Sequence, residues 1–343
     1  MTTKEDLITS NRVIEYSHTI GICVMTGRGF MFPVDTAISK DGKIHTVSKG
    51  YRPAVYQTRT NIYDVDGQFY LDYGSFGNGP GQYQMPCGMD ADSEGNVYVS
   101  DEEINRITVY SNDGKYQTHW GRSGSGPGEF VGPSGLAIDK NDDVYVADHL
   151  NNRVQKYTKD GEFLFSFGDS GSHSENLNLP WGLTVNNDGF IYVADWGNHG
   201  VVKFSGEGEF VARYGSEGSN DGEFVNPSSV AVDEDGFIYV ADWGNERVQI
   251  LDQSGNFVTK LRGESDLSKW AEEAYVSNQE EFKTRQTANL EPELSQFGGD
   301  AYDESAHTEK FFWGPTSVKL DSQGRLYVTE SNRHRVQIYK RVS

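Results

Sequence analysis

The stretch "GFIYVADWGNERVQILDQSGNFV" at residues 236–258 is one of several near-copies of a single pattern. Related copies are "GFIYVADWGNHGVVKFSGEGEFV" at 189–211 and "DDVYVADHLNNRVQKYTKDGEFL" at 142–164. Each copy alternates apolar and polar residues and breaks at a turn that contains Gly, which is typical of short antiparallel strands joined by hairpins. The shared letters therefore describe a repeated β-unit, and the residue after "YVAD" is the part that varies.

Prolines mark the period of this repeat, because each stands just before a short apolar run such as "SGLAID" or "SSVAVD". The six prolines in this place are Pro33, Pro86, Pro133, Pro180, Pro227 and Pro315. Four alternating runs follow each of the first five prolines, which predicts a four-stranded antiparallel sheet for each unit. One such sheet cannot bury both of its faces, whereas six sheets packed radially can. We therefore predict an all-β fold, a six-bladed β-propeller.

The last unit has only three runs, so we expect an N-terminal strand to complete it. The segment "GICVMTG" at residues 21–27 is similar to the fourth run of the other units, such as "FLFSFG". A strand from the start of the chain that pairs with the end of the chain would remove an exposed sheet edge.

The pattern "YVADxxNxRV" resembles the NHL repeat, and the resemblance covers nearly the whole chain. It implies one NHL-type propeller over residues 1–343. The recurring acids and arginines of the pattern are predicted to be structural, with a carboxylate capping a turn and a guanidinium binding it. These residues are Asp101, Asp148, Asp195, Asp242 and Glu330, with Arg106, Arg153, Arg247 and Arg335.

The formal net charge of −21 repels phosphate backbones and anionic membranes, so we predict neither a nucleic-acid partner nor a membrane partner. No apolar run approaches the roughly 20 residues that span a bilayer. The N-terminus lacks the apolar stretch of a secretory signal, so we expect a cytoplasmic protein. The two cysteines, Cys23 and Cys87, fit neither a zinc pair nor a disulfide framework, and we expect two buried thiols.

In a propeller, the loop that enters the first strand and the loop between the second and third strands open on one face. The residues in these loops combine aromatic rings with both signs of charge, which is typical of a small-molecule site. The candidates for acid–base catalysis and charge stabilisation are His149, Glu102, Arg52 and Lys49. The candidates for substrate binding are Trp181, Trp196, Trp243, Tyr51 and Trp270. The alternative is that the tryptophans plug the mouth of the ring.

An insertion at residues 263–312 separates the fifth and sixth units, and the spacing of its first apolar residues predicts a partly helical segment. Because it replaces a loop on the candidate face, we interpret it as a lid, with Trp270, Tyr275 or Phe282 pointing down. A packing ornament and a dimer contact are the alternatives.

Two enzyme families of similar fold offer residue-level comparisons. Peptide-amidating lyases hold zinc with three His, some directly after the inner-strand Pro. No His follows those prolines here, so that motif is absent. Lactonase-type propellers bind calcium, and by that resemblance Asp35, Glu102 and Asn332 are candidate ligands for a divalent metal, calcium or zinc.

Two functional hypotheses remain. The first is a small-molecule-binding propeller, a hydrolase or lyase, with its site at the axial mouth under the insertion. The alternative is a non-catalytic protein-interaction scaffold of the NHL type. Substrate, metal and oligomeric state stay open.

Overall fold

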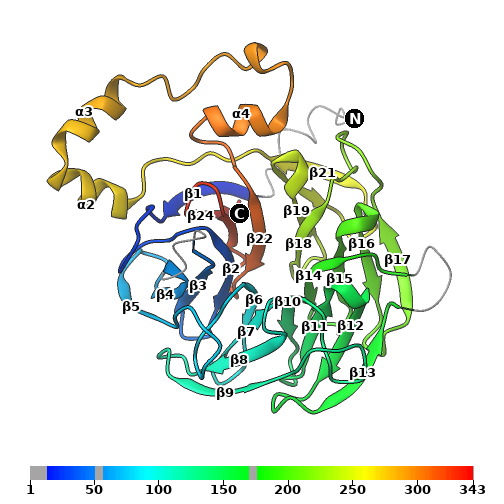
Figure 1. The fold of residues 1–343 in the computed structure, drawn as a ribbon. Helices are drawn as coiled ribbons and strands as arrows, with labels where there is room; N and C mark the ends of the chain where they lie inside the picture. The colour runs from blue at the N-terminus through cyan, green and yellow to red at the C-terminus, as the bar shows by residue number, and fades with distance from the viewer. Residues whose placement is uncertain (1–13, 51–56, 170–175, 343) are drawn as a thin grey trace.

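A computed structural model describes residues 14–50, 57–169 and 176–342. It confirms six four-stranded antiparallel sheets arranged as the blades of a ring (Figure 1). Within each blade the strand that begins at proline lies nearest the centre, and the later strands lie progressively outward. None of the helices in the described ranges is both long enough and apolar enough to cross a lipid bilayer.

The strands of the blades are as follows. Blade 1 contains β2 (Pro33–Ile38), β3 (Ile44–Ser48), β4 (Arg59–Tyr63) and β5 (Phe69–Tyr73). Blade 2 contains β6 (Pro86–Ala91), β7 (Val97–Asp101), β8 (Arg106–Tyr110) and β9 (Tyr116–Trp120). Blade 3 contains β10 (Pro133–Ile138), β11 (Val144–Asp148), β12 (Arg153–Tyr157) and β13 (Phe163–Phe167). Blade 4 contains β14 (Pro180–Val185), β15 (Ile191–Asp195), β16 (Gly200–Phe204) and β17 (Phe210–Tyr214).

The last two blades differ at their outer edges. Blade 5 contains β18 (Pro227–Val232), β19 (Ile238–Asp242), β20 (Arg247–Leu251) and β21 (Phe257–Leu261). Blade 6 contains β22 (Pro315–Leu320), β23 (Leu326–Glu330), β24 (Arg335–Arg341) and, as its outer strand, β1 (Ile14–Ile20). Short 3-10 turns follow the second strand of three blades: η2 (His149–Asn151), η3 (Trp196–Asn198) and η4 (Trp243–Asn245).

An N-terminal strand closes the ring, as predicted, but it is not the segment at 21–27. Strand β1 pairs antiparallel with β24 from Ile14 opposite Arg341 to Ile20 opposite Val336. Gly21 then takes a φ of 129°, and a Cβ there would lie 2.7 Å from the Cα of Arg335. The chain therefore leaves the sheet at Gly21, and residues 21–27 belong to the connection to blade 1.

The hydrophobic core lies between neighbouring blades, in six clusters built mainly from the second and third strands. At four seams the last aromatic residue of an outer strand packs on a turn glycine of the next blade. The pairs are Tyr73 with Gly114, Trp120 with Gly161, Phe167 with Gly208, and Tyr214 with Gly255. A larger residue in these turns would displace the ring, so the turn glycines are required by packing as well as by their positive φ.

The structural role predicted for the repeated acids and arginines is confirmed in three blades. Arg153 Nε lies 2.8 Å from Asp148, Arg247 Nε lies 2.7 Å from Asp242, and Arg335 Nε lies 2.7 Å from Glu330. In blade 4, where Gly200 replaces the arginine, Arg213 of the outer strand reaches Asp195 at 2.8 Å. In blade 2, Arg106 binds backbone carbonyls of the preceding loop instead.

A second repeated contact ties each of five blades to the next one. The residue that ends the loop between the second and third strands has a φ of 52–55°. Its side chain accepts a hydrogen bond from the N–H of the residue before the next inner-strand proline. The pairs are Asn105 with Gly132 (2.8 Å), Asn152 with Leu179 (2.8 Å), His199 with Asn226 (3.1 Å), Glu246 with Gly314 (2.6 Å) and His334 with Phe32 (3.0 Å). We call this contact the inter-blade clamp.

The insertion between β21 and β22 is partly helical, as expected. It contains α2 (Lys269–Ser277), α3 (Gln279–Thr287), η5 (Leu294–Phe297) and α4 (Ala301–His307). Figure 1 shows α2 and α3 beyond the outer side of the ring, next to blades 6 and 1. Helix α4 contacts the loop that carries η4 in blade 5. Helices α2 and α3 therefore do not cover the centre of the ring.

Candidate functional site

One residue from each blade occupies the same structural position, directly after the second strand. We call these six residues the upper rim: Lys49, Glu102, His149, Trp196, Trp243 and Ser331. The last residue of the second strand pairs with the inner-strand proline in every blade, for example Asp148 with Pro133. The register therefore places all six at the same end of their blades, beside the entry to the inner strand.

The rim side chains of blades 3 to 5 form a continuous aromatic arc together with Trp181, which follows Pro180. The ring centroids of His149 and Trp181 are 4.8 Å apart, those of Trp181 and Trp196 are 5.5 Å apart, and those of Trp196 and Trp243 are 5.1 Å apart. Trp243 ends the arc with 39% of its surface exposed. The structure therefore brings four sequence-predicted site residues into one contact chain, the aromatic arc.

The rim side chains of blades 1 and 2 carry opposite charges. Lys49 and Glu102 both act on the thiol of Cys87, which directly follows Pro86. Burial, followed by the nearby Glu102 carboxylate, raises the pKa of Cys87 well above its usual range. Cys87 is thus a neutral thiol and not an activated nucleophile. The other cysteine, Cys23, is exposed, so the expectation of a buried thiol is wrong there.

His149 joins the charged and aromatic parts of the rim. Its Nδ1 lies 3.3 Å from the carbonyl oxygen of Pro180, so a proton on Nδ1 would be held there. Burial lowers the pKa of His149, and the Pro180 carbonyl and Glu102 oppose this shift. The imidazole is therefore neutral near pH 7 and can accept a proton.

Asp35, one of the three candidate metal ligands, lies in a structural hydrogen-bond network. Asp35 is buried, and its carboxylate accepts hydrogen bonds from the N–H groups of Thr36 (2.8 Å) and Met89 (2.8 Å) and from the Ser317 hydroxyl. Lys319 Nζ lies 3.7 Å away and supplies the positive charge. In the described part of the chain, no three His, Cys, Asp or Glu side chains gather as metal ligands would. Asp35 therefore acts as a structural link between blades 1, 2 and 6, which corrects its assignment as a metal ligand.

Trp270 is also misplaced by the prediction, because it is only 1% exposed and lies away from the rim. Its ring contacts Phe30 and Tyr63 at centroid distances of 5.5 and 5.4 Å, and its Nε1 donates to the Gly67 carbonyl at 2.6 Å. Gly67 lies in the turn of blade 1 that corresponds to Gly114 in blade 2. Trp270 therefore supplies the seam aromatic between blades 6 and 1. Tyr51 and Arg52 lie outside the described residues.

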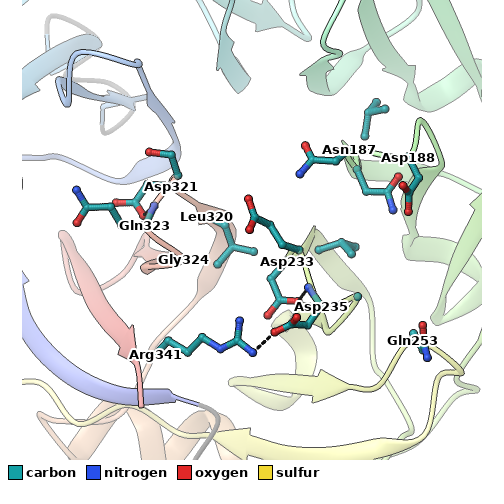
Figure 2. A pocket seen from close by; sticks show the side chains of 16 residues that line it. Asn187, Asp188, Asp233, Asp235, Gln253, Leu320, Asp321, Gln323, Gly324 and Arg341 are labelled. Atoms are coloured by element: carbon teal, nitrogen blue, oxygen red, sulfur yellow. Dashed lines mark hydrogen bonds and ion pairs between the residues drawn. The ribbon is translucent and has the colours of Figure 1, made fainter. Parts of the chain in front are cut away.

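A cavity of about 590 Å³ opens on the opposite face of the ring, among the turns after the inner strands of blades 4 to 6 (Figure 2). Its carboxylates already shape these turns. Asp233, for example, accepts the N–H of Phe237 at 2.9 Å and the hydroxyl of Tyr239 at 2.9 Å. Arg341 reaches into it and pairs with Asp235, and no lining residue is aromatic. The upper rim is the better candidate, because its aromatic side chains form one partly exposed arc that ends at Trp243, beside side chains of both charges.

One residue that belongs with the site was not predicted as part of it. Cys87 follows Pro86 as Trp181 follows Pro180, so its position in the repeat already predicts a place next to the upper rim. Cysteine is so commonly a buried apolar residue that its type gave no further indication.

Comparisons with known proteins agree with this architecture. The NHL repeat model matches residues 177–204, 224–251 and 312–339, and a family model described as a 6-bladed beta-propeller matches residues 90–166. No curated protein sequence matches the chain.

Solved structures with the same fold include lyases. A streptogramin B lyase is 11% identical with a TM-score of 0.56, covering 96% of this chain and 98% of that chain. Virginiamycin B lyase from Staphylococcus aureus is 13% identical with a TM-score of 0.52, covering 90% of this chain and 80% of that chain. A protein of unknown function from Bacteroides thetaiotaomicron is 18% identical with a TM-score of 0.61, covering 95% of this chain and 75% of that chain. At these identities the likeness shows the fold alone: the chain is a six-bladed β-propeller that carries NHL repeats.

Proposed function

We propose that the upper rim binds a small molecule, with the aromatic arc as the apolar contact surface. The contact chain from His149 through Trp181 and Trp196 to Trp243 carries this proposal. Aromatic surface that is left exposed beside unpaired charges is costly to keep in water and is typical of a binding site. The inter-blade clamps lie in the same loops as the rim residues, and their hydrogen bonds connect these loops to the neighbouring blades.

The same geometry supports a hydrolase or lyase activity at this site. Neutral His149 can remove a proton from a bound molecule through Nε2, while its Nδ1 stays held by the Pro180 carbonyl. Lys49 can stabilise negative charge that develops on the ligand. The lyases among the solved neighbours are consistent with this class of reaction, but at their low identity they do not identify the substrate.

The binding proposal is tested by following the indole N–H signals of the six tryptophans by NMR during titration with a library of small aromatic compounds. A ligand on the arc should shift the signals of Trp181, Trp196 and Trp243 and leave those of Trp120 and Trp270 in place. Trp196→Ala and Trp243→Ala should each weaken binding about tenfold or more. Phe210→Ala, which removes an aromatic ring 36% exposed on β17, is the matched control and should have no effect.

Binding that survives both tryptophan substitutions would contradict the proposal. Once a ligand is known, His149→Ala should abolish its turnover and retain most of its affinity, because the arc still holds it. Equal loss of turnover and affinity would assign His149 to binding alone.

One observation favours the non-catalytic alternative. Trp243 is 39% exposed at the open end of the arc and is adjacent to α4, so a protein partner could cover both. In that case a partner would protect backbone amides of both η4 and α4 from hydrogen exchange, whereas a small ligand would protect only the rim.

A further inference from the structure

The upper rim is polar in one half and aromatic in the other. Going round the ring, the equivalent positions hold an ammonium group (Lys49), a carboxylate (Glu102), an imidazole (His149) and two indoles (Trp196, Trp243). Neighbouring blades thus present opposite charges at the same height, and the aromatic arc begins at the next blade. We propose that the ligand is a zwitterion with an apolar body, of the α-amino acid or short-peptide class. This inference rests on the proposed function and specifies its ligand.

The two charges are available to a ligand. Within residues 14–50, 57–169 and 176–342, neither Lys49 nor Glu102 forms an ion pair within 4 Å, although both lie close enough to act on the same thiol. Both side chains are half-buried, so they are partly shielded from bulk water. Each could therefore form a charge-assisted hydrogen bond with one end of a zwitterion.

The arrangement also discriminates against other ligand classes. A simple anion that reaches Lys49 would meet the Glu102 carboxylate beside it, and a simple cation at Glu102 would meet Lys49. A neutral aromatic molecule could use the arc but would leave both charges without a partner. Only a ligand that carries both charges close together satisfies the whole polar half.

His149 joins the polar half of the rim to the aromatic half. His149 is influenced by Glu102 on one side and contacts the Trp181 ring at 4.8 Å on the other. The polar and aromatic halves are therefore contiguous, as the backbone and side chain of an aromatic amino acid are. The ammonium group is expected beside Glu102, the carboxylate beside Lys49, and the side chain on Trp181 and Trp196.

The experiment compares four probes that share a phenylethyl body and differ in charge. They are L-phenylalanine (zwitterion), N-acetyl-L-phenylalanine (anion), L-phenylalanine amide (cation) and 2-phenylethanol (neutral), and their binding is measured by saturation-transfer NMR and calorimetry. The zwitterion should bind at least tenfold more tightly than the other three. Glu102→Gln should remove this advantage and improve binding of the anion, and Lys49→Met should do the same for the cation. Glu234→Gln, on the opposite face, is the matched control and should change nothing.

The outcomes separate this inference from the proposed function. If all four probes bind alike, depend on Trp196 and ignore Glu102 and Lys49, the zwitterion inference is wrong and the binding site stands. If none of the probes binds or shifts an arc tryptophan, the zwitterion inference also fails, and the wider aromatic library then decides the fate of the site.

Discussion

At the scale of a single residue, His334 links the last blade of the ring to the first blade. It has a φ of 55°, and its Nδ1 accepts the N–H of Phe32, which links blade 6 to blade 1 at 3.0 Å. An Nδ1 that accepts a hydrogen bond must be unprotonated. Burial lowers the pKa of His334 to about 4, so the ring stays neutral over most of the pH range in which histidine usually titrates.

This clamp predicts a specific acid sensitivity. Between pH 6.5 and about 4 the unfolded chain binds a proton at His334 and the folded chain does not. Its contribution to stability is therefore complete above pH 6.5 and is lost as the pH falls through that window. His334→Asn places at this site the residue that blades 2 and 3 use. The free energy of unfolding lost between pH 7.5 and pH 4.5 should be about 2–3 kcal/mol smaller in this variant than in the unmodified protein. Denaturant titrations at pH 7.5 and 4.5 check this, and parallel losses in both proteins would contradict it.

Glu246 fills the same clamp position in blade 5 and predicts the opposite pH dependence. Burial raises the pKa of Glu246 to about 7, although the Gly314 N–H favours the charged form. The folded chain therefore retains a proton that the unfolded chain releases between pH 4.5 and 7, and stability falls as the pH rises through this range.

Glu246→Gln keeps the acceptor oxygen and removes the charge. We expect it to stabilise the protein by about 3 kcal/mol at pH 8.5 and to have little effect at pH 5. Chemical denaturation at the two pH values measures the difference, with the exposed Glu234→Gln as the control. A gain of the same size at both pH values would show that the charge is not the cause.

At the scale of elements, the insertion packs into the ring, and its buried side chains include Trp270 and Phe312. Four of the other five seams use the last aromatic residue of an outer strand, but strand β1 ends at Ile20 and supplies none. Trp270 of α2 takes that place against Phe30, Tyr63 and Gly67. Helix α3, in contrast, buries none of its residues. The first part of the insertion is thus an anchor, and the lid hypothesis fails for it.

Trp270→Ala should therefore cost about 3–5 kcal/mol of folding free energy, because it opens a cavity at the seam where the ring closes. Phe282→Ala is the matched control: this ring contacts Tyr275 at a centroid distance of 5.3 Å on the partly exposed helices, and its loss should cost less than about 1.5 kcal/mol. Thermal and denaturant unfolding of both variants compares these costs. If the two substitutions cost the same, Trp270 is not the seam residue.

At the scale of the whole molecule, stability depends on joining the two ends of the chain. Strand β1 covers the edge of β24 over Ile14–Ile20, and without it blade 6 would present an open strand. Deletion of residues 1–20 should lower the melting temperature and cause concentration-dependent association, measurable by light scattering. A synthetic peptide of residues 14–20 should reverse the association in trans, and a scrambled peptide should not. A monodisperse deletion variant with an unchanged melting temperature would contradict this account of closure.

Local pattern was enough to predict the architecture. Tight turns and period-2 alternation depend on neighbouring residues, so the six prolines and the repeated "YVAD" runs predicted six four-stranded blades. Equivalent positions of a repeat also take equivalent places in each blade. The repeat therefore correctly predicted that Lys49, Glu102, His149, Trp196 and Trp243 lie at one end of the blades.

Contacts between distant residues decided the rest. The neutral clamp of His334, the ion pair of Asp35 with Lys319 and the seam position of Trp270 all depend on partners far away in the chain. The strand at 14–20 was missed for the same reason, because it pairs with β24 at the far end of the chain and Gly21 then approaches Arg335 closely. Repeat spacing places a residue on a blade, but only packing between blades determines whether that residue faces a ligand or a neighbouring sheet.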